Sequence, residues 1–289
     1  MGPLPVTAAS IRQGRRPRFS PGGAGVWLFL AALGVVALFP FFLMLCTSLK
    51  PIDEIFETGR LLPRRISLVG YATVFAHSLL LRYLLNGVIV TVLILAGQLL
   101  VTIPAAYAFA KLSFRGREAL FSLVLAALVF PRYIAAVPNF LFLSRLRLID
   151  TYAALTLPFI GSPLGVFLLR QFFRQVPWEY FDAARLDGCS LSQMLRLVLM
   201  PLIRPAVGAF AIFSIVSHWN DFFWPLVVVQ TAKMFTPPAG IVYFADAEAG
   251  TRWDIVMAAA VVIIAPLLLT FIAARRQFIS SLMHQTLKG

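Results

Sequence analysis

The sequence predicts an all-α integral membrane protein with six transmembrane helices, and three observations lead to this prediction. First, 60% of the 289 residues are hydrophobic and 13% are charged, whereas soluble domains carry about a quarter charged residues. Second, charged residues are absent from the windows 19–49, 83–110, 151–169 and 255–274, each long enough for a span of ~20 residues. Third, two more apolar windows hold a single charge each, 119–143 with Arg132 and 206–230 with Asp221.

These windows set the expected order of elements. A Pro-, Gly- and Arg-rich N-terminal tail covers 1–23, a six-helix membrane domain covers 24–275, and a C-terminal tail covers 276–289. The expected spans are 24–46, 84–108, 119–143, 153–172, 206–230 and 255–274. A polar loop, 174–204, joins the fourth and fifth spans. Prolines at 131, 138, 158, 163 and 225 bend or break helices, and together they favour a pathway through the membrane over a static bundle.

Basic residues in the loops set the expected orientation. With the N-terminus inside, the inner loops and tails hold 15 Lys and Arg residues and the outer loops hold 9. The positive-inside rule then favours a cytoplasmic N-terminus and C-terminus. The net charge of +13 accordingly indicates a basic face against anionic membrane lipid, and no nucleic-acid-binding motif accompanies it.

The loop 174–204 contains the most informative polar stretch in the sequence. It carries three acidic residues, which are Glu179, Asp182 and Asp187. We predict a short amphipathic helix here, because acidic side chains near a helix N-terminus are stabilised by the helix dipole. A tight turn with positive φ is expected at Gly188. Such a helix-turn-helix fits a groove on a soluble partner, whereas its acidic residues oppose binding to an anionic bilayer.

A sequence motif lies within this loop. Asp182-Ala183-Ala184 is followed after three residues by Gly188, and after nine more by Val198-Leu199-Met200-Pro201. This pattern resembles the EAA motif of ABC importer permeases, in which Glu-Ala-Ala, three residues, Gly and nine residues precede Ile-x-Leu-Pro. All spacings match. The chain departs from the motif at Asp182, Val198 and Met200, each a conservative replacement.

Further stretches resemble the carbohydrate-uptake branch of that family over residues 25–289. They are Thr47-Ser48-Leu49-Lys50-Pro51 with Glu54-Ile55-Phe56, Leu85-Asn86-Gly87, and 219–226. The resemblance is to the second permease of maltose-type and glycerol-3-phosphate-type systems. It implies the type I importer fold with a cytoplasmic coupling helix.

The same resemblance implies partners and a division of labour. The partners are a second, different permease chain, two ATPase subunits and an extracytoplasmic substrate-binding protein in the bacterial inner membrane. The implied ATPase-coupling residues are Glu179, Asp182, Ala183, Ala184, Asp187, Gly188 and Pro201. We expect no catalytic residue, metal or cofactor on this chain. It has no Gly-x-x-x-x-Gly-Lys-Ser/Thr sequence, so ATP and Mg²⁺ are expected on the ATPase subunits.

Polar and aromatic residues inside the apolar windows are the candidates for a substrate pathway. They are Arg132, Asn220, Asp221, Trp219, Trp224 and Asn86, with Gln98 and Asn139 as further candidates. Arg132 and Asp221 fall at a similar depth, which predicts either an ion pair or a shared polar cavity. The tryptophans suit either a sugar ring or the aromatic belt at the membrane surface.

These residues favour one function over several others. The favoured one is import of a sugar, oligosaccharide or polyol. The alternative is glycerol-3-phosphate or a glycerophosphodiester, since 167–173 resembles that subgroup and Arg132 suits a phosphate, although Asp221 would repel it. A membrane enzyme would need clustered carboxylates or histidines, and a channel or secondary transporter would have no use for the helix-turn-helix. The tail 276–289 either reaches the ATPase pair, as the resemblance implies, or frays.

Overall fold

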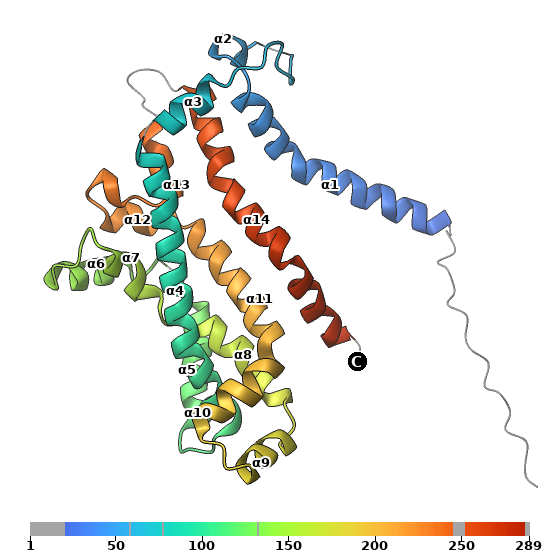
Figure 1. Ribbon diagram of the computed structural model, residues 1–289, viewed down its shortest axis with the longest axis vertical. Helices are drawn as coiled ribbons and strands as arrows, with labels where there is room; N and C mark the ends of the chain where they lie inside the picture. The colour runs from blue at the N-terminus through green and yellow to red at the C-terminus, as the bar shows by residue number, and fades with distance from the viewer. Residues whose placement is uncertain (1–20, 58, 77, 132, 245–251, 287–289) are drawn as a thin grey trace, which may run out of the picture. The chain divides into compact units, whose positions relative to one another are not determined.

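The computed structural model describes residues 21–57, 59–76, 78–131, 133–244 and 252–286, with side chains for 25–57, 59–76, 79–131, 133–242 and 252–272. All regular structure in these ranges is helical (Figure 1), as the sequence predicts. The chain forms two compact units, Met1–Met44 and Leu45–Gly289.

The first unit contains most of helix α1, Pro21–Ser48. The stretch Gly25–Ser48 is long and apolar enough to cross a membrane. Apolar side chains are exposed all around it, among them Trp27, Leu30, Val36 and Phe39. A helix that is apolar on every side is typical of a membrane span, in agreement with the predicted first span.

The second unit contains the other helices. They are α2 Ile52–Ile55, α3 Val69–Ala76, α4 Ser78–Lys111, α5 Arg117–Val129, α6 Ala136–Arg145, α7 Tyr152–Thr156, α8 Pro163–Gln175, α9 Glu179–Leu186, α10 Leu191–Gln193, α11 Met200–Trp219, α12 Phe223–Val228, α13 Pro237–Gly240 and α14 Trp253–Thr286. Single turns complete them: η1 Leu157–Phe159, η2 Met194–Leu199, η3 Ala232–Met234 and η4 Ile241–Phe244. In Figure 1, α9 and α10 lie at the opposite end of this unit from α2 and α3.

Four stretches of the described residues suffice, by length and composition, to cross a membrane. Besides α1 they are Leu79–Lys111, Leu191–Trp219 and Trp253–Ile272. A fifth is the pair Tyr152–Phe159 and Pro163–Gln175, which is bent by 46°. The predicted third span, 119–143, is divided into α5 and α6 by non-helical residues near Pro131, and the count of six crossings stays a prediction.

The fifth span differs from its predicted bounds of 206–230. Its helix begins at Leu191, inside the loop predicted for 174–204, and ends at Trp219. Pro201 does not break it, because the preceding turn η2 is π-helical: the Met200 N–H bonds to the Leu195 carbonyl, and this wider turn accommodates a residue without an N–H. Asp221 lies beyond the helix, so it does not interrupt a helical span.

The C-terminal part also differs from the prediction in its bounds. Helix α14 continues to Thr286, so most of the segment assigned to the tail 276–289 extends the last helix. Residues 1–20 of the predicted N-terminal tail and residues 287–289 lie outside the described residues.

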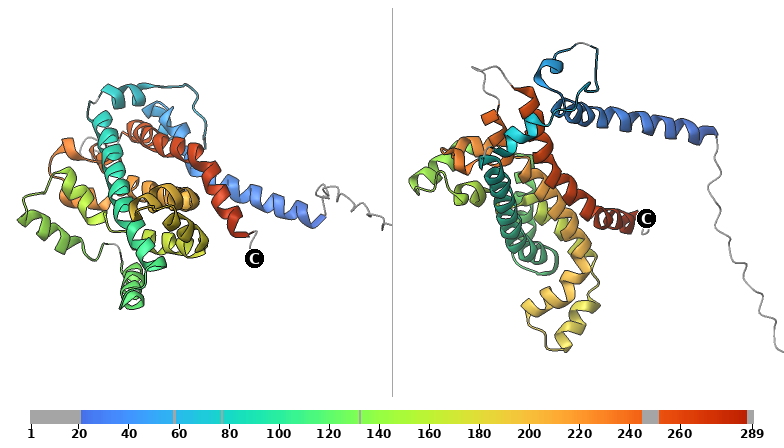
Figure 2. Two further views of the ribbon diagram at one scale, coloured as in Figure 1. Left: turned by 60° about the horizontal axis from the view of Figure 1, so that its bottom comes forward. Right: turned by 45° about the horizontal axis from the view of Figure 1, so that its top comes forward.

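Helix α4 organises the packing of the second unit. It contacts α8 most extensively and also packs on α11 and α5, while α14 packs on α3 and α11. Both views of Figure 2 show α6 beside α12. Three buried apolar clusters result, and one of them lies where α4, α8 and α11 meet α9. This cluster positions the loop that carries the motif.

Candidate functional site

The motif-bearing loop folds into a compact projection, which we call the coupling segment, residues 177–201. Helix α9 opens it, a turn at Gly188 reverses the chain, and α10 leads through η2 into α11. Glu179 and Asp182 lie in the first turn of α9, and Arg185 lies in its last turn. This distribution matches the dipole of the helix.

Gly188 closes α9 with a Schellman motif. Its φ is +74°, and its N–H donates to the carbonyl of Arg185 at 3.0 Å. The next N–H, of Cys189, donates to the carbonyl of Ala184 at 3.0 Å. These two bonds satisfy carbonyls that the helix end leaves without partners. The predicted positive-φ turn at Gly188 is confirmed.

A capping box starts the second arm of the segment. The hydroxyl of Ser190 accepts from the N–H of Gln193, and the Gln193 side chain accepts from the N–H of Ser190 at 2.8 Å. This pair was not among the residues predicted from the sequence. The spacing of Ser190 and Gln193 is the signal that shows it, because Ser-x-x-Gln is a capping-box pattern.

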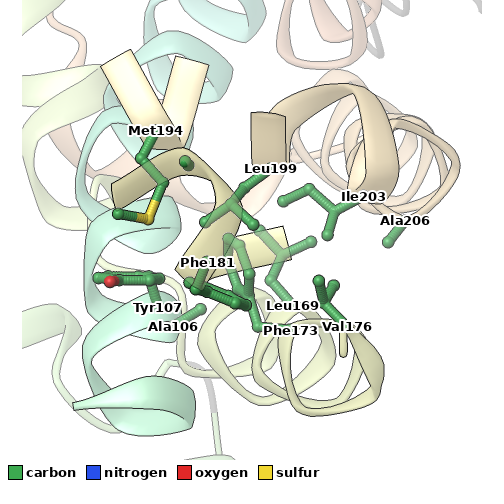
Figure 3. Close-up of a cluster of buried hydrophobic side chains, with 11 residues drawn as sticks. Ala106, Tyr107, Leu169, Phe173, Val176, Phe181, Met194, Leu199, Ile203 and Ala206 are labelled. Carbon is green, nitrogen blue, oxygen red and sulfur yellow. The ribbon is translucent and has the colours of Figure 1, made fainter. Parts of the chain in front are cut away.

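A buried cluster fixes the coupling segment to the membrane helices (Figure 3). Phe181 of α9 is 0% exposed. Its ring stacks on Tyr107 of α4, and Tyr107 also meets Phe173 of α8 edge-on at 5.9 Å between centroids. Met194, Leu199 and Ile203 close the cluster from the α11 side. The projection is therefore anchored to three long helices at once.

The motif residues divide between this cluster and the surface. Ala184 and Leu199 are buried in the cluster, and of the predicted ATPase-coupling residues all but Ala184 are exposed. The exposed ones are Glu179, Asp182, Ala183, Asp187, Gly188 and Pro201. The neighbouring Leu186 is 89% exposed. The outer face of α9 thus combines acidic side chains with a prominent apolar one, and such a face suits a protein groove better than a lipid surface.

Four of the proposed pathway residues, which are Asn86, Trp219, Trp224 and Asp221, are buried and engaged in hydrogen bonds, and the first three make interior contacts between helices. Asn86 is 1% exposed: its amide donates to the carbonyls of Lys233 and Phe235, both at 2.9 Å, and accepts from the Tyr152 hydroxyl at 2.6 Å. The indole of Trp219 donates to Ile263. The indole of Trp224 donates to Ala154. These contacts join α4, α7, α11, α12 and α14, and a role in the pathway stays a prediction for all three.

Asp221 and Asn220 occupy the break between α11 and α12. The Asp221 Oδ1 atom accepts from the N–H of Trp224 at 3.3 Å and lies 3.5 Å from the Tyr133 hydroxyl. Asn220 is exposed, and its amide donates to the carbonyl of Val216. Arg132 lies outside the described residues, so its predicted pairing with Asp221 stays a prediction.

A cavity of about 670 Å³ opens between α4, α5, α6, α8 and α11. Among the described residues, its polar lining is formed by Gln98, Asn139, Ser162, Ser217 and His218, and its other lining residues include Pro131, Pro158 and Pro163. Proline-broken helices at membrane depth are tolerated where they line such a space. Gln98 and Asn139 were among the sequence candidates, whereas the two serines were not. Serine occurs too widely in membrane helices to be a signal by itself.

Gln98 is held rigidly at the wall of this cavity. Its amide donates to the carbonyl of Phe159 at 2.9 Å and accepts from the Ser214 hydroxyl at 2.6 Å. The Nε2 atom of His218 lies 3.4 Å from the amide nitrogen of Gln98, and the His218 ring meets Phe159 edge-on. Amide, hydroxyl and imidazole groups beside aromatic rings form a surface suited to hydroxylated ligands.

A carboxylate ties two loops together at the periphery of the second unit. Asp150 accepts from the N–H groups of Gln230 and Thr231 and from the Thr231 hydroxyl. Partial burial by itself raises the pKa of Asp150, but the bonds from Gln230 and Thr231 outweigh it and leave the pKa below the ordinary value. The φ of +61° at Asp150 is one that Asp and Asn tolerate better than other side chains.

Comparisons with known proteins agree with this architecture. Residues 98–283 match the family described as binding-protein-dependent transport system inner membrane component. The arabinooligosaccharides transport system permease protein AraQ of Bacillus subtilis is 32% identical, over 94% of this chain and 98% of that protein. The sn-glycerol-3-phosphate transport system permease protein UgpE of Brucella abortus is 33% identical, over 70% of this chain and 72% of that protein.

A solved structure shares the fold. It is the crystal structure of a bacterial ABC transporter involved in the import of the acidic polysaccharide alginate, with a TM-score of 0.81 and 22% identity, over 91% of this chain and 100% of that chain. The family match covers the cavity wall, the coupling segment and α14, and the relatives are transport permeases, not enzymes. The chain therefore belongs to the family of binding-protein-dependent transport system inner membrane components, the multi-pass permeases of ABC transporters.

Proposed function

We propose that this chain is the permease subunit of an ATP-driven importer that moves a sugar, oligosaccharide or polyol into the cytoplasm. The observation that carries the proposal is the coupling segment, a rigid projection whose outer face is acidic and apolar and whose inner face is packed on α4, α8 and α11. A segment of this kind transmits force between a soluble partner and membrane helices.

The proposed partners follow from the family. Two ATPase subunits, which bind ATP and Mg²⁺, engage the coupling segments of this chain and of a second, different permease chain. A substrate-binding protein delivers substrate from outside. Closure of the ATPases draws the coupling segments together, and the helices then rock from an inward-open to an outward-open arrangement. The N-terminus and the C-terminus lie in the cytoplasm.

The substrate class is supported by the cavity and by the relatives. The polar side chains among the described lining residues are amide, hydroxyl and imidazole groups beside aromatic rings, and such groups suit sugar hydroxyls. The oligosaccharide permease is similar over 94% of this chain, and the glycerol-3-phosphate permease over 70%. Glycerol-3-phosphate or a glycerophosphodiester is the second candidate, supported by the latter relative.

Transport by the complete complex tests the proposal. The complex, purified through a tag on this chain and reconstituted in vesicles with its binding protein, should accumulate a labelled arabino-oligosaccharide in an ATP-dependent manner and should exclude labelled glycerol-3-phosphate. Accumulation of glycerol-3-phosphate alone would support the second candidate. Absence of any co-purified ATPase would refute the importer itself.

Asp182 offers a matched pair of variants for the coupling role. Its side chain is exposed, and so is its ion pair with Arg185 at 3.8 Å. Because exposed ion pairs contribute little to stability, Asp182→Arg should leave the fold intact and weaken ATPase binding. Asp182→Glu keeps the negative charge and introduces the glutamate of the family motif, so this variant should transport normally. Equal transport by both variants would remove Asp182 from the coupling interface.

A further inference from the structure

The ends of α4 and α8 cap each other. Lys111, the last residue of α4, donates from Nζ to the carbonyl of Val176, which follows α8, at 2.6 Å. Arg170 of α8 donates from Nε to the carbonyl of Phe109, in the last turn of α4, at 3.1 Å. The last carbonyls of a helix lack partners within the helix, so each of these helices supplies the cation that satisfies the other.

Lys111 extends this junction to the coupling segment. Its side chain is buried, and Nζ lies 4.6 Å from the ring centre of Trp178 and 4.9 Å from that of Phe181. Glu179 adds a favourable Coulomb interaction. A cation held over aromatic faces away from water is bound more strongly than one at the surface. The ammonium group of Lys111, at the end of α4, thus contacts both the end of α8 and the start of α9.

Arg170 extends the same junction to α5. Its guanidinium group is buried, and its Nη2 atom alone donates to both carboxylate oxygens of Glu118, at 3.2 and 3.1 Å. The group also lies 3.7 Å from the ring centre of Phe121. This charge-assisted contact ties the start of α5 to α8. Lys111 and Arg170 together connect four helices.

We propose that Lys111 is a positioning residue that fastens the coupling segment to the neighbouring ends of α4 and α8, so that all three move as one body when the ATPases close. The inference rests on the proposed function, since the ATPases supply the motion. Without the ammonium group, the Val176 carbonyl loses its partner and α9 keeps only its apolar contacts to α4. The coupling segment then moves without carrying the membrane helices with it.

Three variants test this role in the purified complex. Lys111→Met removes the charge and keeps an apolar stem, and Lys111→Arg keeps the charge. Arg115→Met removes one charge from the exposed loop after α4 and serves as the control. We expect Lys111→Met to retain the ATPase subunits and their hydrolysis while the labelled arabino-oligosaccharide transported per ATP falls about tenfold. The other two variants should keep the wild-type ratio.

A wild-type ratio in Lys111→Met would overturn the proposal, and so would an equal loss in Arg115→Met. The ratio separates a positioning role from a structural one, because a misfolded chain loses ATPase binding and transport together. If Lys111→Met does not assemble with its partner subunits, a distance measurement in the wild-type protein still tests the proposal. Spin labels at Ser113 and Ser192, in a background without Cys46 and Cys189, report the distance between the end of α4 and the coupling segment.

The proposal requires that this distance be the same without nucleotide and with ATP and vanadate. A change in the wild-type distance between the two states would refute it. If no ATPase co-purifies, the proposed function fails, but measurements on the isolated chain still test the fastening role of Lys111. Lys111→Met should then broaden the distance distribution and Lys111→Arg should not; identical distributions in all three chains would refute the fastening role alone.

Discussion

The rings of Tyr107 in α4 and Phe181 in α9 stack with their centres 6.2 Å apart and their planes 21° apart. Both side chains are buried. Aromatic pairs of this kind contribute about 0.5–1.5 kcal/mol beyond the burial of their area. The stack therefore joins the coupling segment to α4 through the core of the second unit. Changes in the turn that follows α9 should first affect the surface of the segment.

Gly188→Pro should uncouple the transporter while the chain still inserts in the membrane. Proline cannot adopt the φ of +74°, and it lacks the N–H that bonds to Arg185. Gly188→Asn is the control, because asparagine tolerates the left-handed conformation. Stimulation of ATP hydrolysis by the loaded binding protein, measured in vesicles, should be lost in the first variant and kept in the second. Full stimulation in Gly188→Pro would contradict the coupling role.

The orientation of the chain can be read by cysteine labelling. Ile66 is 75% exposed in the loop before α3, and Ser192 is exposed in the coupling segment. Ser192 is a better position than Ser190, whose hydroxyl caps α10. In a background without Cys46 and Cys189, Ile66→Cys should react with an impermeant maleimide in intact cells, and Ser192→Cys only after permeabilisation. The reverse pattern would exclude both the positive-inside assignment and the coupling role.

Asn86 and Asn139 should respond differently to the same substitution. Asn86→Ala removes the donor to the Phe235 carbonyl and the acceptor of the Tyr152 hydroxyl, whereas the Lys233 carbonyl keeps its bond from Arg82. The loss should cost about 1–3 kcal/mol and lower the melting temperature in detergent. Asn139 lines the cavity, so Asn139→Ala should leave the melting temperature unchanged and raise the substrate concentration for half-maximal transport. Equal melting temperatures for both variants would show that the Asn86 bonds contribute little.

Variants of Asp221 separate three roles. As a cap for α12, Asp221 can be replaced by Asn, which keeps an acceptor for the Trp224 N–H, whereas Asp221→Ala should lose about 1 kcal/mol. As a ligand for sugar hydroxyls, Asp221→Asn should keep its expression level and need more substrate. As the partner of Arg132, Asp221→Asn should lower stability, and the added Arg132→Gln should partly restore it. Unchanged expression and transport in every variant would exclude all three roles.

The stability contributed by Asp150 should depend on pH. Because folding lowers the pKa of this carboxyl group, its contribution is fully present above the ordinary value of 3.8 and is lost as the pH falls through the lower pKa of the folded chain. Asp150→Asn tolerates the left-handed backbone and removes the charge, so at pH 7 it should cost about 1 kcal/mol. Thermal melts below pH 3.8 should show a smaller difference from the wild type. A difference that is constant from pH 7 to strongly acidic pH would contradict this assignment.

The part of the site that local spacing determines could be predicted. The turn at Gly188 follows from a single residue type at the end of an amphipathic stretch, and only glycine meets the backbone requirement without strain. The capping box is equally local. It was not predicted, because Ser190 and Gln193 are common residue types and the prediction rested on the motif and its acidic residues. The start of the fifth span at Leu191 was not predicted because Arg196 and Arg204 interrupt the apolar window, whereas a helix continues through charged residues that remain accessible to water.

The parts that depend on distant contacts could not be predicted. A polar side chain in an apolar window indicates function by default, and this led to Asn86. Its partners, however, are carbonyls at Lys233 and Phe235, which no pattern near Asn86 reveals. The same holds for Lys111, which the sequence shows only as one basic residue among those of the inner loops. Its role depends on where the end of α8 lies.

Because of the π-helical turn at Met194–Leu199, the coupling segment can lose one residue without a change in the direction of the helix that leaves it. Such a turn bonds five residues back, as Met200 does to Leu195, and so holds one residue more than a regular turn. Deleting one residue there leaves an ordinary α-helix and the same exit direction. A deletion further along α11 would instead rotate the two sides of the cut by ~100° relative to each other. We therefore expect that a chain lacking one residue between Gly188 and Pro201 keeps the exit direction of α11.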